Sequence, residues 1–116
     1  MITILPADKA LLQGLSAPEG VEAMVLRDND GSIFGHALFR VVGERVEVLS
    51  VQTELPVMAE GLIRSVLNAG DCRGATVGFC ADEGLAPMLR HLEFEPVEDG
   101  YAVSLEQFFR GECRCQ

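Results

Sequence analysis

The first groups with a chemical use are backbone amides at a predicted strand-to-helix junction. Residues 46–70, VEVLSVQTELPVMAEGLIRSVLNAG, begin as a β-rich run and continue as an amphipathic helix over 57–69. Pro56 suits the first turn of that helix, and Gly70 is a typical stop. Because N–H groups at a helix start point outward and carry partial positive charge, the junction predicts an anion site.

Histidine and cysteine side chains give weaker indications of chemistry. His36 lies within a predicted strand, where it could line a cleft, and His91 lies near a helix end, where the dipole favours a cation. Cys80 follows an apolar run, which indicates buried packing. Cys113 and Cys115 form a C-x-C pair. The pair could serve redox chemistry or metal capture, and the alternative is a frayed terminus without a role. The spacings match no zinc motif, so we predict no metal site.

The elements that must position these groups alternate along the chain. We expect strands at 2–5, 21–27, 32–42, 46–51, 75–80, 94–97 and 101–105, and helices at 8–15, 57–69, 83–92 and 105–110. Turns at 28–31 and 43–44 make an antiparallel meander of three strands, and a turn at 98–100 closes a C-terminal hairpin. The helical crossover predicts that strand 75–80 lies parallel to strand 46–51, in a mixed α/β (α+β) sheet.

Composition and charge exclude several classes of protein. The 116 residues predict one domain, 1–116, with a flexible tail at 110–116, and a 48% apolar content argues against disorder. A net charge of −9 argues against nucleic acid and against anionic membrane surfaces as partners. No apolar run approaches the roughly 20 residues of a membrane span, and the start MITILPADKA lacks the features of a signal peptide. We therefore expect a cytoplasmic protein.

Several segments resemble the GNAT N-acetyltransferases. DGSIFGHALF resembles their "x-G-x-I-x-G" strand pair, VEVLSV their fourth strand, GLIRSVL the "G-x-x-L-L" start of their central helix, and LRHLEFEPV their "Y-x-K-x-G-F" segment. The likeness spans about residues 21–105 and concerns the order of elements more than exact motifs. It implies splayed fourth and fifth strands with a pantetheine arm between them, acetyl-CoA as donor and an amine as acceptor.

The resemblance also implies a donor site. Its residues would be the backbone of Leu49, Ser50 and Val51 at the thioester carbonyl, and Val57, Met58, Ala59, Glu60, Gly61 and Leu62 at the pyrophosphate. The family signature R/Q-x-x-G-x-G/A is reduced here to TELPVMAEG, which keeps only Gly61 and adds two carboxylates that would repel a pyrophosphate. Simple helix packing is the alternative explanation for Gly61.

The catalytic residues of the family are poorly matched. With Phe94 aligned, its tyrosine acid corresponds to Leu89 and its glycine to Glu93. Glu47, on the strand where the family sometimes places a general base, and Tyr101, the only tyrosine, are the remaining candidates. A solvated strand glutamate and a hairpin tyrosine with its ring packed and its hydroxyl in water are the alternatives.

Two functions remain open at this point. One is an acyl-CoA-dependent N-acetyltransferase acting on an unknown amine, and the other is a non-catalytic GNAT-like domain for interaction or ligand sensing. The family places two helices between its first two strands, whereas residues 6–20 have room for one short helix. The sheet surface left uncovered favours a homodimer.

Overall fold

The computed structural model describes residues 2–109, and the predicted tail with Cys113 and Cys115 lies outside them. The elements are β1 (Thr3–Pro6), α1 (Lys9–Gly14), β2 (Glu22–Arg27), β3 (Ile33–Val42), β4 (Arg45–Thr53), α2 (Ala59–Cys72), β5 (Val77–Cys80), α3 (Ala86–His91), β6 (Glu95–Val97), β7 (Gly100–Ser104) and α4 (Leu105–Phe108). Short 3₁₀ turns, η1 (Pro56–Met58) and η2 (Glu83–Leu85), precede α2 and α3.

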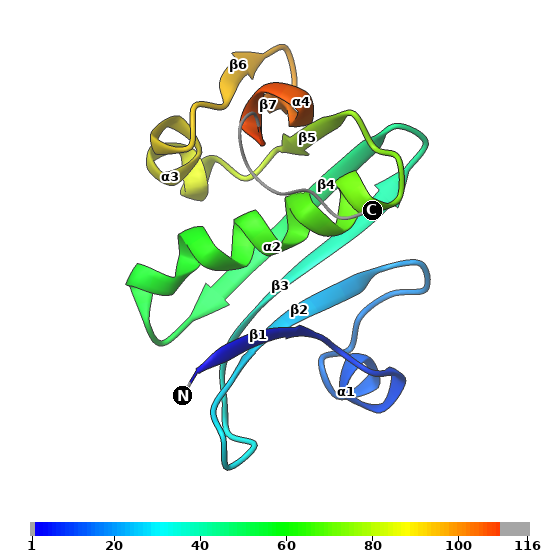
Figure 1. The fold of residues 1–116 in the computed structure, drawn as a ribbon, viewed down its shortest axis with the longest axis vertical. Coiled ribbons are helices and arrows are strands. Elements are labelled where there is room, and N and C mark those ends of the chain that lie inside the picture. Colours follow the sequence, from blue (N-terminus) through cyan, green and yellow to red (C-terminus); the bar gives the residue numbers. More distant parts are fainter. Residues whose placement is uncertain (1, 110–116) are drawn as a thin grey trace.

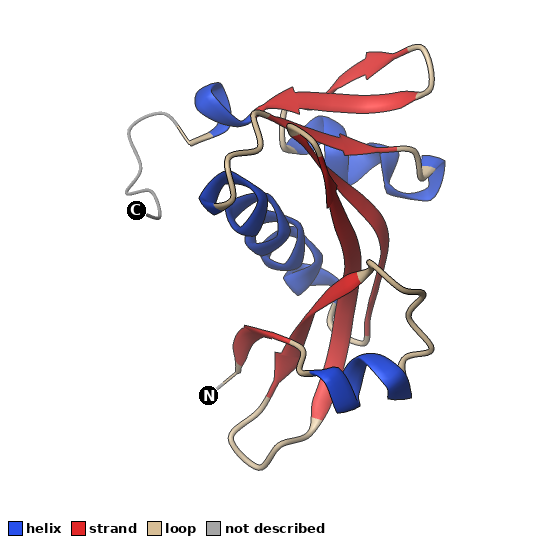
Figure 2. Ribbon diagram, turned by 90° about the vertical axis from the view of Figure 1, so that its right-hand side faces the viewer, coloured by secondary structure: helices blue, strands red, loops and turns tan. Residues whose placement is uncertain are grey.

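All the strands join one sheet in the order β1-β2-β3-β4-β5-β7-β6. The meander β2-β3-β4 is antiparallel, β4 and β5 are parallel, and β6 and β7 form the closing hairpin. The predicted mixed α/β (α+β) sheet is therefore confirmed, including the parallel pairing of β5 with β4. Figure 1 shows α2 crossing this sheet diagonally, and Figure 2 shows α2 and α1 on opposite faces.

The prediction that Gly70 ends the long helix is wrong. Helix α2 continues to Cys72, and Gly70 is buried inside it. A Cβ built on Gly70 would lie 2.5 Å from the Cβ of Val46 on β4. Glycine is therefore required because α2 approaches the sheet too closely for any side chain, which is a tertiary constraint and not a stop signal.

The predicted helix over 83–92 is divided. Pro87 has no N–H to donate, so it lies in the first turn of α3, and η2 precedes it. Glu93 follows α3 with φ 68°, and the N–H groups of Glu93 and Phe94 donate to the carbonyls of Arg90 and Leu89. This is a Schellman C-cap, whose left-handed residue is usually glycine. Glu93 thus occupies the place of the family's glycine, as the alignment on Phe94 implies.

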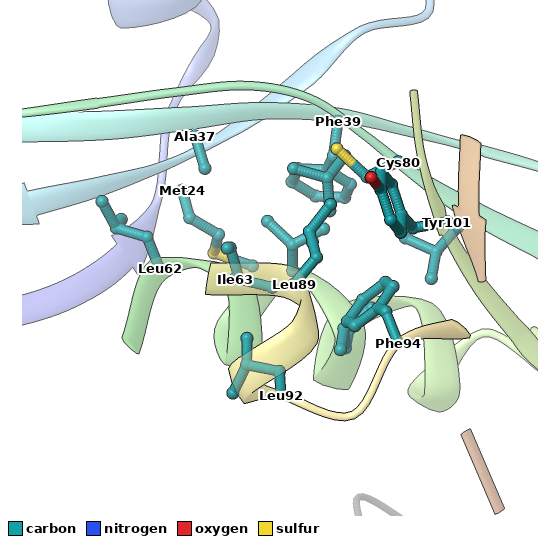
Figure 3. Packing of buried hydrophobic residues seen from close by; sticks show 14 of the residues in the cluster. Met24, Ala37, Phe39, Leu62, Ile63, Cys80, Leu89, Leu92, Phe94 and Tyr101 are labelled. Carbon is teal, nitrogen blue, oxygen red and sulfur yellow. The ribbon is translucent and has the colours of Figure 1, made fainter. Parts of the chain in front are cut away.

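The main core lies between the sheet and α2. Alternate residues of β4, Val46 and Val48, pack toward α2, and α3 adds Leu89, which is fully buried. Figure 3 shows Met24 and Leu62 toward one end of this core, Leu89 near its middle, and Cys80, Phe94 and Tyr101 toward the other end. In the part of the chain that the structure describes, the opposite face of the sheet has only α1, which buries none of its own residues completely. The two faces are therefore covered unequally.

Gly70→Ala tests the close approach of α2 to β4. The added methyl would meet Val46, so we expect a loss of about 1–3 kcal/mol in the free energy of unfolding in urea. The matched control is Gly14→Ala in α1, where nothing lies within 4 Å and the gain in helix propensity should stabilise slightly. A Gly70→Ala protein as stable as the unmodified chain would contradict this packing.

Candidate active site

The site is built where two parallel strands part. Strand β5 pairs with β4 from Arg45 to Val48 and ends at Cys80, whereas β4 continues to Thr53. Pairing with β3 shifts register at this point: Phe39 is opposite Val48 and Leu38 is opposite Ser50, so Leu49 is the extra residue of a β-bulge. Within residues 2–109, the backbone of β4 beyond Val48 therefore has no strand partner on its β5 side.

A cavity of about 550 Å³ opens at this parting of the strands. It lies on the face opposite α2, because Glu47 and Phe79 alternate with the core residues of their strands. Its walls come from β3, β4, β5, the loop after β5 and the β6–β7 turn, through Arg40, Arg45, Glu47, Val48, Leu49, Phe79, Ala81, Asp82 and Asp99. We call this the β4–β5 cavity.

Glu47 is the central charged group of the β4–β5 cavity. The expectation that it is solvated is wrong, because it is only 5% exposed. Its Oε1 accepts from Arg40 Nε at 2.5 Å and its Oε2 accepts from Arg45 Nη2 at 2.6 Å. Both oxygens are thus held by guanidinium groups, and these charge-assisted bonds compensate for the burial.

The two arginines were missed by the sequence reasoning, although a signal for one of them exists. With the turn expected at 43–44, residues 40 and 47 fall opposite each other on antiparallel strands, and opposite charges at such positions attract. The structure confirms that register for Arg40 and Glu47. Arg45 in addition lies over the ring of Phe79, 4.4 Å from its centroid.

The predicted pyrophosphate site lies at the start of α2. Val57 is 84% exposed, whereas Leu62 is fully buried and can contribute only its backbone. The N–H groups of Met58 and Ala59 already donate to backbone carbonyls through η1. The number of amides free for an anion is therefore smaller than the sequence implies.

Gly61 faces β1. A Cβ placed on Gly61 would lie 3.2 Å from the Cδ1 of Ile4. This close contact supports the helix-packing explanation for the glycine, independently of any ligand.

Glu60, in the first turn of α2, contacts Arg64 and His91. Its Oε2 accepts from Arg64 Nε at 3.0 Å, and its Oε1 lies 3.1 Å from His91 Nε2 at the end of α3. Hydrogen bonding from Arg64, followed by its charge and that of His91, lowers the pKa of the Glu60 carboxyl. The carboxylate that opposes an anion here is therefore already paired with the nearest cations.

Tyr101 is buried, with 4% of its surface exposed. Its hydroxyl donates to Glu83 Oε2 at 3.1 Å, so the alternative of a hydroxyl in water is wrong. Leu89, at the family's tyrosine position, lies fully in the core. Among the aligned positions, then, no proton donor replaces the missing tyrosine.

The other described residues considered from sequence do not line the β4–β5 cavity. His36, opposite Gln52, lines a shallower depression of about 360 Å³, and partial burial lowers the pKa of its imidazole. Cys80 is buried, as predicted, and burial raises the pKa of its thiol. Within residues 2–109 no group of three or more His, Cys, Asp or Glu side chains could hold a metal ion, and no helix is long and apolar enough to cross a membrane.

Comparison with known structures identifies the fold. Ribosomal-protein-S18-alanine N-acetyltransferase from Escherichia coli superposes with a TM-score of 0.69 at 14% identity, over 90% of this chain and 94% of that one. A putative acetyltransferase from Exiguobacterium gives 0.70 at 11% identity, over 95% and 97%. A putative N-acetyl transferase from E. coli, solved bound to coenzyme A, gives 0.66 at 14% identity, over 90% and 98%. No protein-family model and no curated protein matches the sequence.

Glu47→Gln tests how much the buried carboxylate contributes to stability. The amide keeps the size but leaves Arg40 and Arg45 without their counter-charge, so the free energy of unfolding should fall by about 1–3 kcal/mol. Glu22→Gln is the matched control, because Glu22 also pairs with an arginine, Arg73, at the surface. Loss of such an exposed pair should cost less than about 1 kcal/mol. Equal urea denaturation curves for the two variants would exclude a special role for Glu47.

Proposed function

We propose that this chain, which has the GNAT fold, is an acyl-CoA-dependent N-acetyltransferase that acts on an amine. The observation that carries the proposal is the parting of β4 from β5 beyond Val48, with the bulge at Leu49 and the β4–β5 cavity beside it. A strand edge without a partner can hydrogen-bond an extended arm laid along it. The likeness to a structure solved with coenzyme A bound supports acetyl-CoA as the donor.

The residues present fit the pantetheine end of such a donor. The backbone of Leu49, Ser50 and Val51 lies past the last β5 pair, where its amides could hold a thioester carbonyl. At the helix start, backbone from Val57 through Met58, Ala59, Glu60 and Gly61 to Leu62 would face the pyrophosphate. Two of those amides are engaged by η1, so the side chains of Arg64 and His91 would contribute more to binding the anion.

Catalysis in this proposal depends mainly on positioning. Acetyl-CoA supplies an activated thioester, and the chain holds the amine against it in a cavity of defined shape. Glu47 and Tyr101 remain the candidates for general base and general acid. Each is already hydrogen-bonded, Glu47 to two arginines and Tyr101 to Glu83, so proton transfer through either would require those contacts to rearrange.

A non-catalytic GNAT-like domain is the second candidate function. The buried Leu89 in place of the family's tyrosine and the Glu60 carboxylate at the donor site favour it. In that case, the same scaffold would serve in interaction or ligand sensing. The two functions differ in one measurable property, because only the enzyme must bind acetyl-CoA and release its thiol.

We also propose that the chain is cytoplasmic and forms a homodimer. Among the described residues, α1 is the only helix on the sheet face opposite α2, and Ile33 and Leu49 are more than a third exposed. A second copy would cover apolar surface of this kind. Sedimentation at micromolar concentration should then give a species near twice the 12.6 kDa chain mass. A species of single-chain mass at that concentration would contradict the dimer.

Titration with acetyl-CoA, combined with Glu60→Gln, tests the donor site. Removing the Glu60 charge removes its repulsion of the anion, so affinity measured by calorimetry should rise several-fold at low salt and less at high salt. Glu19→Gln, which removes the same charge from a loop residue that does not line the site, should change little. If neither the unmodified protein nor Glu60→Gln binds acetyl-CoA, the enzyme proposal fails and the non-catalytic function is favoured.

A further inference from the structure

The β4–β5 cavity has two walls of opposite charge. Arg40 and Arg45 form one wall, and Asp82 and Asp99 lie in the loop after β5 and the β6–β7 turn. The chain as a whole carries a net charge of −9, so two adjacent guanidinium groups on one wall are a local exception to its acidic composition. Such separation of charge within one cavity favours a ligand that is itself dipolar.

The arginine wall is held in place by Glu47. Each arginine donates one hydrogen bond to that carboxylate: Arg40 donates from Nε and Arg45 donates from Nη2. Within residues 2–109 the other N–H groups of these two guanidinium groups have no protein partner, and both side chains are nearly half exposed. The fork of an arginine fits a carboxylate through two parallel hydrogen bonds. Glu47 therefore acts as a positioning residue for an anion-binding pair.

The acidic wall lies on the side where the strands part. Asp82 Oδ1 accepts from the N–H of Gly84 at 2.9 Å, which fixes this carboxylate at the start of η2. Asp82 lies two residues after the end of β5 at Cys80, so it is close to the point at which β4 becomes unpaired. An ammonium group beside Asp82 would lie next to the unpaired backbone after Val48.

The distance along β4 from Glu47 to the parting of the strands indicates the length of a ligand that would span the two. Strands rise about 3.3 Å per residue, so the row that holds Glu47 is about 7 Å from the bulge at Leu49. A carboxylate bound at Arg40, level with Glu47, would leave room for a short carbon chain before the parting of the strands. An α-amino acid has that length once its hydrogen bonds to the guanidinium groups are included.

We propose that the acceptor is a free amino acid, whose carboxylate is bound by Arg40 and Arg45 and whose ammonium is received by Asp82. This assignment rests on the proposed acetyltransferase function. The ammonium first loses a proton to solvent. Its nitrogen then forms the C–N bond to the acetyl carbon, the C–S bond breaks with its electron pair on sulfur, and a second nitrogen proton passes to the thiolate. The net products are the N-acetyl amino acid, CoA thiol and one proton.

The test compares the twenty protein amino acids with their primary amides as acceptors for acetyl-CoA, by the rate of thiol release. The amides lack the carboxylate, and their amines are less basic and more available as free base at neutral pH. A cavity that ignored the carboxylate would therefore prefer the amides. We expect at least one amino acid to exceed its amide by tenfold or more in kcat/KM.

Variants of the arginine wall sharpen the comparison. Arg40→Gln should reduce kcat/KM for the amino acid at least tenfold more than it reduces kcat/KM for the amide, and Arg40→Lys should give an intermediate loss of that preference. Arg73→Gln is the matched control, because Arg73 also pairs with a glutamate but lies outside the cavity, and it should keep the preference. Before the kinetic assay, each variant must show a cooperative unfolding transition in urea, which demonstrates that it is folded.

Separate outcomes identify what has failed. If acetyl-CoA binds by calorimetry but every amide is used as well as its amino acid, or no amino acid is used at all, the acceptor assignment is overturned and the donor site stands. If acetyl-CoA does not bind, the proposed enzyme function is overturned, and the acceptor assignment with it. Loss of the preference in Arg73→Gln as well as in Arg40→Gln would show an effect of overall charge and would also overturn the assignment.

Discussion

The parallel pairing between β4 and β5 is the constraint on which the rest of this structure depends. It lasts for four residues, from Arg45 to Val48, and then stops because β5 ends while β4 continues. Unpaired backbone N–H and C=O groups inside a sheet cost free energy unless another group hydrogen-bonds to them. The bulge at Leu49 turns this part of β4, so that the strand meets α2 on one side and the cavity on the other.

Close packing of α2 supports that arrangement from behind. Gly70 brings the helix against Val46, and the valine rows of β4 are thereby buried up to the point where the strands part. Rigid contact on one face lets the other face be irregular. The charged residues around Glu47 are therefore held on a rigid backbone. A binding site depends on such rigidity, because its groups must keep a defined geometry.

Much of the fold could be predicted from sequence because its signals are local. The turns at 28–31 and 43–44 fix the meander, and the crossover helix fixes the parallel strand. The site was harder, since it depends on contacts across strands. Core-facing residues of a regular strand are two apart, but Val48 and Val51 are three apart. This interval indicated the bulge. Burial of Glu47 and Tyr101 was not readable, because it depends on partners brought from β3 and from η2.

The two outer strands of the sheet have different consequences for the solubility of the chain. Strand β6 is three residues long and contains Glu95 and Pro96, so it offers little for another strand to pair with. Strand β1 is an uncharged Thr-Ile-Leu-Pro segment whose proline comes only at its end. Sheet-to-sheet aggregation would therefore begin at β1. Under crowding or partial unfolding, this N-terminal edge is the one at which another molecule's strand would pair.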